Sequence, residues 1–531
     1  MRRSGVLLPI TSIPSKYGIG GFSKECYEFV DFLERAGQSL WQILPLGPTG
    51  YGDSPYQSFS TYAGNPYFID LEKLIEAGWI TEEDCGGDMA AKRHGDGNVA
   101  SEFATDRTAC DSASGEKNPR EDIEKVSPQK QRYVDYGEIY QTRFIVLRKA
   151  YEKSNIEDNA AFREFCEENA YWLDDYALYM AVKNAFGGKS FCEWDEDIRF
   201  RKPEAVKRYR GKYAEEIGFI RFQQFLFAEQ WHALKEYANK KGIRIIGDIP
   251  IYVAYDSADV WAAPELFQLD ENLLPTGVAG CPPDLFSATG QLWGNPLYRW
   301  EYHKETGYDW WMRRISRCYE LYDILRIDHF RGFDEYYSIP YGDPTAEFGC
   351  WKEGPGYDIF QVMKKKLGKR EVIAEDLGLL TPSVVRLVKK SGYPGMKVLL
   401  FAFNAGEPSE YLPHNYDKNV VVYTGTHDND TIEGWIKSAK RADVSYAMKY
   451  LNVKRKKDIR PEMIRAALAS TADTAVIPIQ DYLGLDNSAR MNLPSTLGDN
   501  WKWRLLPGEL SDELAGEMRR MAELYGRVVQ L

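Results

Sequence analysis

The chain has 531 residues, and its 67 Lys and Arg against 79 Asp and Glu give a formal net charge of −12. An acidic chain lacks the basic surface that nucleic acids and anionic membranes require, so we expect neither as a partner. Hydrophobic residues make up 44% of the chain and charged residues 27%, as in folded globular proteins.

Targeting signals and metal motifs are not evident in the sequence. No apolar run approaches the roughly 18 residues of a membrane span, and the apolar stretch VLLPI (6–10) is too short for a secretion signal. The cysteines are far apart and form no Cys-x-x-Cys motif or Cys/His cluster. We therefore expect a cytoplasmic protein with no metal and no cofactor, and the sequence leaves its oligomeric state open.

The N-terminal part is rich in turn-forming and aromatic residues. WQILPL (41–46) is a short apolar run ended by Gly47-Pro48, which predicts a buried strand. Residues 51–70 are dense in Gly, Pro, Ser and Tyr, which predicts a loop. Residues 86–130 are polar and Gly-rich and hold few large apolar residues, so we expect an atypical surface insertion there.

The remaining chain is first helical and then alternates between strand and helix. Residues 137–240 place Leu, Phe and Tyr at spacings of three and four residues, which predicts helices. From residue 243 onward, short apolar runs alternate with helical stretches, which predicts a parallel sheet covered by helices on both faces. The runs are IRIIGDIP (243–250), DILRIDHFRG (323–332), EVIAEDLG (371–378), MKVLLFAF (396–403), NVVVYTGTHDN (419–429) and TAVIPIQDYLG (474–484).

This order of elements predicts an α/β fold, a (β/α)₈ TIM barrel. WQILPL and one further strand, either PYFIDL (66–71) or an unplaced run, would complete the eight strands. The long gaps between runs place inserted subdomains at about 50–240 and about 254–310, within one barrel domain over 1–531. Residues 485–531 are too few for a C-terminal β-sandwich of roughly 100 residues.

Acidic residues fall at the ends of these runs, where a β/α barrel forms its active-site face. They are Asp248, Asp328, Glu375 and Asp428. The two-residue period of a strand puts Arg326 on the same face as Asp328. A single acid at such a place is more often a helix N-cap, but several together favour chemistry. Paired carboxylates are what glycosidic bond cleavage requires.

Several motifs resemble those of the α-amylase clan. LRIDHFRGF (325–333), IAEDLG (373–378) and YTGTHDND (423–430) are similar to its three catalytic regions, and GDIPIYV (247–253) is similar to its first signature region. The clan consists of retaining enzymes that act on α-glucans, so the resemblance implies a retaining reaction on such a substrate.

Three further motifs narrow the resemblance to the 4-α-glucanotransferases (amylomaltases, or disproportionating enzymes) of glycoside hydrolase family 77. They are YGDSPYQSFSTYAGNP (51–66), PPDLFSATGQLWGNPLY (282–298) and MNLPSTLGDNWKWR (491–504). Residues 86–130 do not resemble the family, and the tail reads NLPSTLGDNW where the family has Thr-Pro-Gly-Thr after the Asn. That departure affects the sugar contacts expected of this loop and leaves the chemistry unchanged.

The resemblance implies a catalytic domain that transfers α-1,4-glucan segments. Asp328 would be the nucleophile, Glu375 the acid/base and Asp428 the acid that stabilises the transition state. The partners would be maltooligosaccharides, amylose or glycogen-derived α-1,4-glucans. The implied substrate-binding residues are Arg326, His427, Asp248, Tyr56, Trp293 and, as weaker candidates, Asn492 and Asp376.

Elementary electrostatics adds expectations for these groups. Arg326 should help to keep Asp328 ionised, and burial or neighbouring carboxylates should raise the pKa of Glu375. Gly294, Asn295 and Pro296 place Trp293 in a loop. Trp231 and Trp261, in helical stretches, should belong to the core.

Two other functions stay open from the sequence. One is a hydrolytic α-amylase-type glycosidase of the same clan, which the short C-terminal part disfavours. The other is a non-catalytic α-glucan-binding protein, which the presence of Asp328, Glu375 and Asp428 together disfavours.

Overall fold

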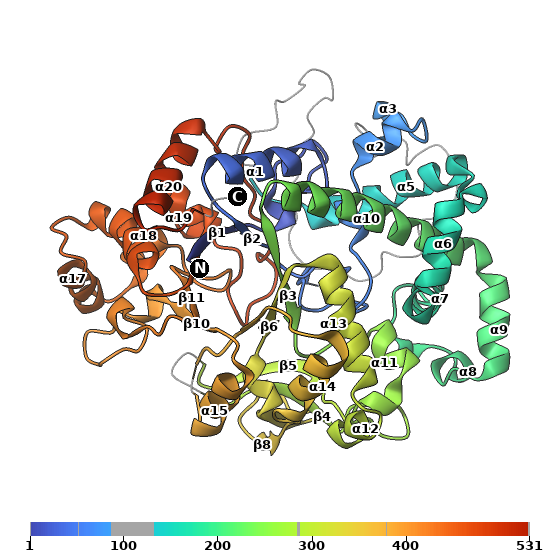
Figure 1. Cartoon of the computed structure of the whole chain (residues 1–531). Helices are drawn as coiled ribbons and strands as arrows, with labels where there is room; N and C mark the ends of the chain where they lie inside the picture. Colours follow the sequence, from blue (N-terminus) through green and yellow to red (C-terminus); the bar gives the residue numbers. More distant parts are fainter. Residues whose placement is uncertain (1, 51, 86–131, 284–286, 379, 529–531) are drawn as a thin grey trace, which may run out of the picture.

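A computed structural model of the chain describes residues 2–50, 52–85, 132–283, 287–378 and 380–528. It confirms the predicted barrel: one eight-stranded sheet whose neighbouring strands pair in parallel, in chain order (Figure 1). Its strands are β1 (Arg3–Leu7), β2 (Leu40–Gln42), β3 (Arg244–Pro250), β6 (Ile324–Asp328), β9 (Val372–Ala374), β10 (Gly395–Val398), β11 (Val420–Tyr423) and β12 (Thr474–Pro478).

The ring of strands closes at two seams. β12 pairs with β1 over the whole length of both strands. At the other seam, the N–H of Ala374 in β9 donates to the carbonyl of Pro394, just before β10 (2.9 Å). The carboxyl ends of all these strands therefore meet on one face of the barrel.

The eighth strand is at the N-terminus, and the candidate PYFIDL (66–71) was wrong. Pro66–Phe68 form a 3-10 helix, because Pro66 sits at its start and the Asn65 side chain caps it by accepting from the N–H of Tyr67 (3.0 Å). Asp70 then caps α2 (Leu71–Glu76) by accepting from the N–H of Glu72. The run that the sequence left unplaced is β1, which is too short for its periodicity to distinguish it from other apolar runs.

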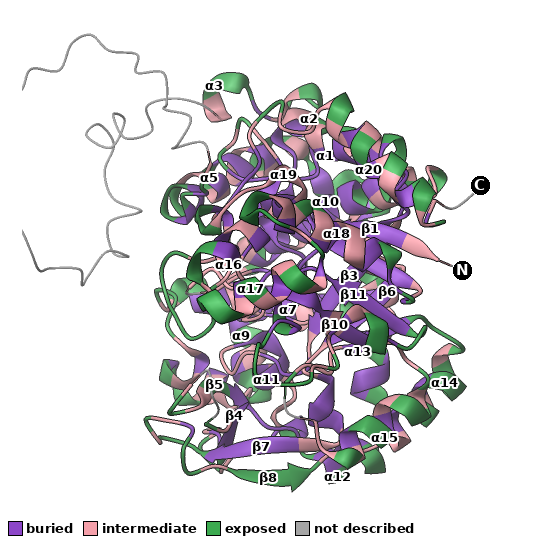
Figure 2. Ribbon diagram, turned by 90° about the vertical axis from the view of Figure 1, so that its left-hand side faces the viewer, coloured by how far each residue is buried: buried purple, intermediate pink, exposed green. Residues whose placement is uncertain are grey.

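Helices cover the outside of the barrel and turn their buried faces inward (Figure 2). In α15 (Pro382–Ser391), Val384 and Leu387 are buried one helical turn apart, as expected for an amphipathic helix. The other covering helices are α1 (Lys24–Arg35), α13 (Asp309–Leu321), α14 (Asp358–Leu367), α16 (Ile432–Ser438), α17 (Arg441–Tyr450), α18 (Ile459–Ala469), α19 (Ile479–Leu483) and α20 (Asp512–Leu524).

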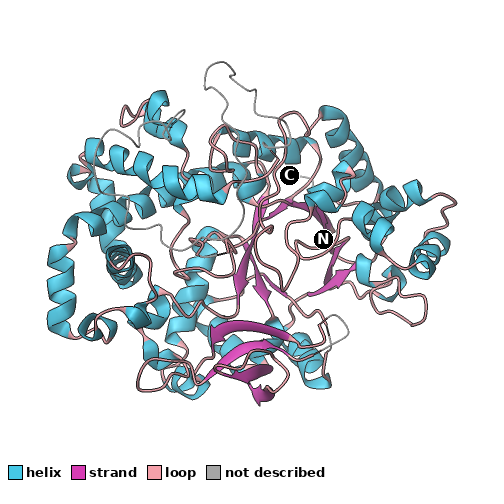
Figure 3. Cartoon of the chain, turned by 180° about the vertical axis from the view of Figure 1, so that it is seen from behind, coloured by secondary structure: helices cyan, strands magenta, loops and turns pink. Residues whose placement is uncertain are grey.

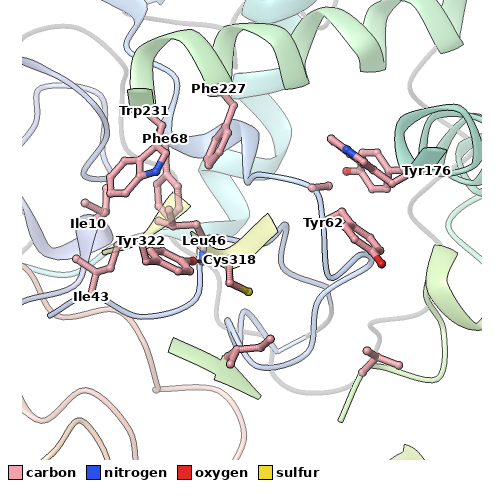
Figure 4. Close-up of a cluster of buried hydrophobic side chains, with 14 of the residues drawn as sticks. Ile10, Ile43, Leu46, Tyr62, Phe68, Tyr176, Phe227, Trp231, Cys318 and Tyr322 are labelled. Atoms are coloured by element: carbon pink, nitrogen blue, oxygen red, sulfur yellow. Dashed lines mark hydrogen bonds between the residues drawn. The ribbon is translucent and has the colours of Figure 1, made fainter. Parts of the chain in front are cut away.

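A helical insertion separates β2 from β3. It comprises α3 (Glu82–Cys85), α5 (Tyr136–Ser154), α6 (Ala160–Glu168), α7 (Ala170–Ala185), α8 (Glu196–Arg199), α9 (Pro203–Lys212) and α10 (Ala214–Lys240). Trp231 and Phe227 project from α10 toward Phe68 and form a core between the insertion and the barrel (Figure 4). Trp231 and Trp261 are both buried, as the sequence indicated.

A second, smaller antiparallel sheet lies beside the barrel (Figure 3). Two connections build it: the one after β3, which also contains α11 (Ala258–Ala262) and α12 (Trp300–Glu305), and the one after β6. Its strands are β4 (Gly277–Cys281), β5 (Gln291–Pro296), β7 (Glu335–Pro340) and β8 (Cys350–Glu353), in the order β5-β4-β7-β8. The pairing of β4 with β7 in this sheet joins the connection after β3 to the connection after β6.

The expectation for residues 86–130 falls outside the described residues. After β12 the described chain contains helices and no further strand, so a C-terminal β-sandwich is absent from this part of the structure. None of the described helices is long and apolar enough to cross a membrane.

Replacing Gly5 by Ala should destabilise the barrel. A Cβ at Gly5 would lie 2.4 Å from both the Cβ and the backbone oxygen of Leu40 on the paired strand, and a backbone atom cannot move aside cheaply. Overpacking of this kind costs about 1–3 kcal/mol, which urea denaturation can measure. Gly211 in α9 is the control: a Cβ there meets nothing within 4 Å, so Gly211→Ala should be neutral or stabilising. Equal stability of the Gly5→Ala variant and the parent would contradict this account.

Candidate active site

The acidic side chains singled out in the sequence lie at the carboxyl ends of four barrel strands. Asp248 is in β3, Asp328 ends β6, Glu375 follows β9, and Asp428 follows β11. In the β3–β6 register Asp248 lies opposite Arg326, and Pro250 lies opposite Asp328. Parallel pairing thus gathers residues that are far apart in the sequence on one rim.

Arg326 bridges two of these acids. Its Nη1 donates to Asp248 Oδ2 (2.5 Å), and its Nη2 lies 3.0 Å from Asp328 Oδ1. The Asp248 side chain is 0% exposed and that of Arg326 is 3% exposed, whereas Asp328 is 30% exposed. The ion pair with Asp248 is therefore internal, and Asp328 is the member of the triad that a substrate can reach.

Aromatic and imidazole rings form the wall next to this triad. The Tyr56 hydroxyl donates to Asp248 Oδ2 (2.9 Å) and lies 3.0 Å from His427 Nε2. The Tyr56 and His427 rings stack, with centroids 5.3 Å apart. Trp501 packs against both rings, with centroid distances of 5.8 Å to Tyr56 and 5.9 Å to His427.

Asp428 is held by two donors. His427 Nε2 lies 3.1 Å from Asp428 Oδ2, and the Asn492 side-chain amide donates to Asp428 Oδ1 (2.6 Å). Burial by itself would raise the pKa of Asp428, but His427 and Asn492 outweigh it and lower the pKa to about 2. The pKa of His427 is raised, because the nearby Asp428 carboxylate outweighs the opposing effect of burial. Asp428 is therefore a permanent anion in the neutral range.

Glu375 is positioned by two backbone N–H groups, one after β6 and one after β9. The N–H of His329 donates to its Oε2 (2.7 Å), and the N–H of Leu377 donates to its Oε1 (2.9 Å). Burial and the Asp328 charge raise the pKa of Glu375 to about 7, against the smaller opposing effects of Arg326 and of these backbone donors. This direction is the one expected from the sequence.

Asp328 differs from the sequence expectation in one respect. Arg326 does favour its ionised form, but burial and the neighbouring Asp248 and Asp428 outweigh that effect and raise the pKa of Asp328 to about 6. The pKa still lies below that of Glu375. Between these values, one carboxylate can act as an anion while the other carries a proton, which is the pair that glycosidic bond chemistry needs.

Trp293 lies in strand β5 of the small sheet, so its placement in a loop was wrong. Gly294 has φ 77° and the β4–β5 register is irregular, which explains why the local sequence suggests a turn. The Trp293 ring meets the His329 ring edge-on, with centroids 4.8 Å apart. Trp293 therefore reaches the carboxyl end of β6 from the inserted sheet.

Asp376 and Asn492 engage protein groups. The Asp376 carboxylate accepts from the N–H of Met396 in β10 (2.7 Å), and no hydrogen bond among the described residues joins it to the other acids. The Asn492 side chain is directed at Asp428. Seven other candidates form one connected cluster, which Asn492 joins through Asp428 and Trp293 borders through His329: Asp248, Tyr56, Arg326, Asp328, Glu375, His427 and Asp428.

Three residues of this cluster were not singled out from the sequence. The backbone N–H of His329 donates to Glu375, and its ring contacts Trp293. Trp501 packs on Tyr56 and His427. Arg490 donates to the backbone carbonyls of Asp428 and Asn492. His329 lies inside the RIDHF motif and Trp501 inside the 491–504 motif, so the motifs carried a signal for both. Among the described residues, no group of three or more His, Cys, Asp and Glu side chains could hold a metal ion.

Comparisons with known proteins point to one family. Residues 8–509 match the family model described as 4-alpha-glucanotransferase. The chain is 46% identical to a 4-alpha-glucanotransferase of Clostridium butyricum over 520 residues, 98% of this chain and 99% of that protein. It is 45% identical to the 4-alpha-glucanotransferase of Thermus thermophilus over 538 residues, 99% of each. Its structure is similar to an amylomaltase from Streptococcus agalactiae in complex with acarbose, with a TM-score of 0.89, 40% identity and coverage of 99% and 100% of the two chains.

Removing Arg326 should lower the free energy of unfolding far more than removing a partner of an exposed ion pair. Arg326→Met leaves the Asp248 carboxylate, which is 0% exposed, without its cation. Breaking a buried ion pair in this way costs about 3–5 kcal/mol, measured by urea denaturation at pH 7. The double variant Asp248→Asn/Arg326→Met should lose less than the sum of the single variants.

The matched control is Lys240, which pairs with Glu236 on the surface of α10, where the two side chains are 70% and 54% exposed. Lys240→Met should cost less than about 1 kcal/mol. An Arg326→Met variant as stable as Lys240→Met would show that the internal ion pair does not hold the rim together.

Proposed function

The chain belongs to the 4-alpha-glucanotransferase family, and from that premise we propose that Asp328, Glu375 and Asp428 are the groups that carry out its reaction. The reaction transfers an α-1,4-glucan segment from a donor to the 4-OH of glucose or of another glucan, with retention of configuration. The observation that carries the assignment is the difference between the environments of Asp328 and Glu375. Arg326 Nη2 lies 3.0 Å from the Asp328 carboxylate and favours its ionised form, whereas Glu375 is held by the N–H groups of His329 and Leu377 and has no such cation among the described residues.

In the first step Asp328 attacks the anomeric carbon of the donor. The bond from this carbon to the leaving 4-oxygen breaks, and Glu375 gives its proton to that oxygen. The products are a glycosyl ester on Asp328 and a shortened glucan with a free 4-OH. Arg326 next to Asp328 stabilises the carboxylate before the attack.

In the second step the acceptor sugar enters in place of the released glucan. Glu375, now ionised, takes the proton of the acceptor 4-OH, whose oxygen attacks the anomeric carbon and releases Asp328. Both steps invert the anomeric centre, so the configuration is retained overall. Glu375 ends protonated and Asp328 ionised, as they began.

Asp428 is proposed to bind sugar hydroxyls more tightly in the transition state than in the substrate. Its permanent negative charge, set by His427 and Asn492, suits a transition state with positive charge on the sugar ring. His427 and Asp248 are proposed to complete the donor subsite, and Tyr56 and Trp293 to present aromatic surfaces to the sugar rings.

Transfer to a sugar and not to water requires an acceptor subsite that excludes water from the glycosyl ester. Trp293 and His329, from the small sheet and the end of β6, are proposed to form a wall of that subsite. The donors would be maltooligosaccharides, amylose or glycogen-derived α-1,4-glucans. A cytoplasmic location and the absence of nucleic-acid and membrane partners remain predictions from the sequence.

Glu375→Gln should trap the glycosyl ester on Asp328. A donor with a good leaving group, such as α-maltosyl fluoride, needs little protonation to glycosylate the nucleophile, and without Glu375 no base activates the acceptor. Mass spectrometry should show the intact protein heavier by one maltosyl unit, and the adduct on the peptide that contains Asp328. Asp328→Asn is the control and should give no adduct with any donor. An adduct on Asp428, or products of inverted configuration from the parent enzyme, would overturn the assignment.

The pH dependence of kcat/KM for maltotriose should be a narrow bell. Activity should rise as pH passes about 6, where Asp328 ionises, and fall above about 7, where Glu375 loses its proton. The two limbs report the titration of the interacting pair. In Glu375→Gln with α-maltosyl fluoride, the rate of adduct formation should keep the acidic limb and lose the alkaline one. An alkaline limb that persists in this variant would assign the proton donor to another group.

A further inference from the structure

Arg490 clamps the segment that follows β12 onto the segment that follows β11. Its Nε donates to the carbonyl of Asn492 (2.8 Å), its Nη2 donates to the carbonyl of Asp428 (2.5 Å), and its Nη1 forms an ion pair with Asp430. One guanidinium thus joins residues that are about sixty positions apart in the sequence. The pair is half-buried, with Arg490 and Asp430 each 20% exposed.

Two more hydrogen bonds between the same segments end on the proposed catalytic machinery. The N–H of Asn492 donates to the carbonyl of His427 (3.0 Å), and its side-chain amide donates to Asp428 Oδ1 (2.6 Å). The Asp428 side chain is 39% exposed, so packing alone does not fix its rotamer. Asn492 and His427 contact its carboxylate, and Arg490 contacts the backbone of Asn492.

The clamp lies where the chain departs from regular structure. Residues 424–431 and 490–505 contain no helix or strand, so no backbone ladder fixes one segment relative to the other. A planar guanidinium with several N–H donors at fixed angles is suited to this task, because it sets the relative orientation of all its acceptors at once.

We propose that Arg490 is a positioning residue for the transfer reaction, which holds Asn492 so that the Asp428 carboxylate points at the donor sugar. The inference rests on the proposed role of Asp428 and adds the device that fixes it. Because Arg490 acts through Asp428, its removal should lower kcat and leave KM for the donor nearly unchanged.

The test uses the full-length enzyme and measures fluoride release from α-maltosyl fluoride, so that weak variants remain measurable. Arg490→Met keeps an unbranched apolar stem and removes all three interactions. A catalytic group misplaced by about 1 Å typically costs on the order of 100-fold in rate, and we expect a loss of that size in kcat. Arg490→Lys, which retains the charge without the fork geometry, should lose roughly tenfold, and it is the variant to use if Arg490→Met does not fold.

Arg2 provides a matched control at the opposite end of the barrel. Like Arg490 it has three acceptors, here the carbonyls of Tyr525 (3.0 Å), Ser470 (2.8 Å) and Leu468 (2.8 Å), and it joins β1 to the C-terminal helices. Arg2→Met should lower the melting temperature at least as much as Arg490→Met and leave kcat unchanged. A loss of kcat common to both variants would mean that Arg490 has only a structural role.

A double-mutant cycle separates this proposal from the proposed role of Asp428 itself. If Arg490 acts through Asp428, then Arg490→Met should change kcat by less than about threefold in an Asp428→Asn background. The same 100-fold loss in both backgrounds would overturn the positioning role. Full activity of Asp428→Asn would instead overturn the role of Asp428, and full activity of Arg490→Met with an inactive Asp428→Asn would overturn the role of Arg490 alone.

Discussion

The internal bridge from Arg326 to Asp248 and Asp328 is the constraint on which the rest of the site depends. A charge that is 0% exposed persists in a folded protein only with a partner, so Asp248 and Arg326 must face each other across β3 and β6. This requirement favours the register of β3 and β6 in which Asp248 lies opposite Arg326. Asp328, two residues beyond Arg326, is then delivered to the rim. The same bridge orients Tyr56, whose hydroxyl donates to the Asp248 oxygen that Arg326 also contacts.

Different environments give three similar carboxyl groups three different properties. Asp428 keeps its negative charge because His427 and Asn492 contact it; Asp328 has one cation to offset burial; Glu375 has backbone donors and an anionic neighbour. The order of their pKa values follows from these partners, since the intrinsic acidities of Asp and Glu are nearly equal. The barrel supplies the differences by bringing each strand end next to different neighbours.

Segments outside the barrel complete the site. The N–H of Val134, just before α5 of the helical insertion, donates to the carbonyl of Lys502 (2.8 Å), and the Tyr136 hydroxyl donates to the carbonyl of Trp501 (2.9 Å). These hydrogen bonds hold Trp501 where its ring packs against Tyr56 and His427. Trp501 has φ 66°, a backbone conformation that is energetically unfavourable for a residue other than glycine. The helical insertion and the C-terminal tail therefore meet at the same wall of the site.

The sequence by itself determined the parts that depend on local pattern: the apolar runs that became strands, the acids at their ends, and the motifs that surround them. The sequence missed Trp293 in β5 because the neighbouring Gly294 suggests a turn. It missed the strand at Arg3–Leu7 because that short segment becomes a strand only by pairing with a distant one, β12. The tertiary structure alone decided the raised pKa of Asp328 and the clamp at Arg490. Both arise from groups that lie tens to hundreds of positions apart in the chain, and electrostatic interactions and hydrogen bonds depend on distance in space, which local periodicity does not encode.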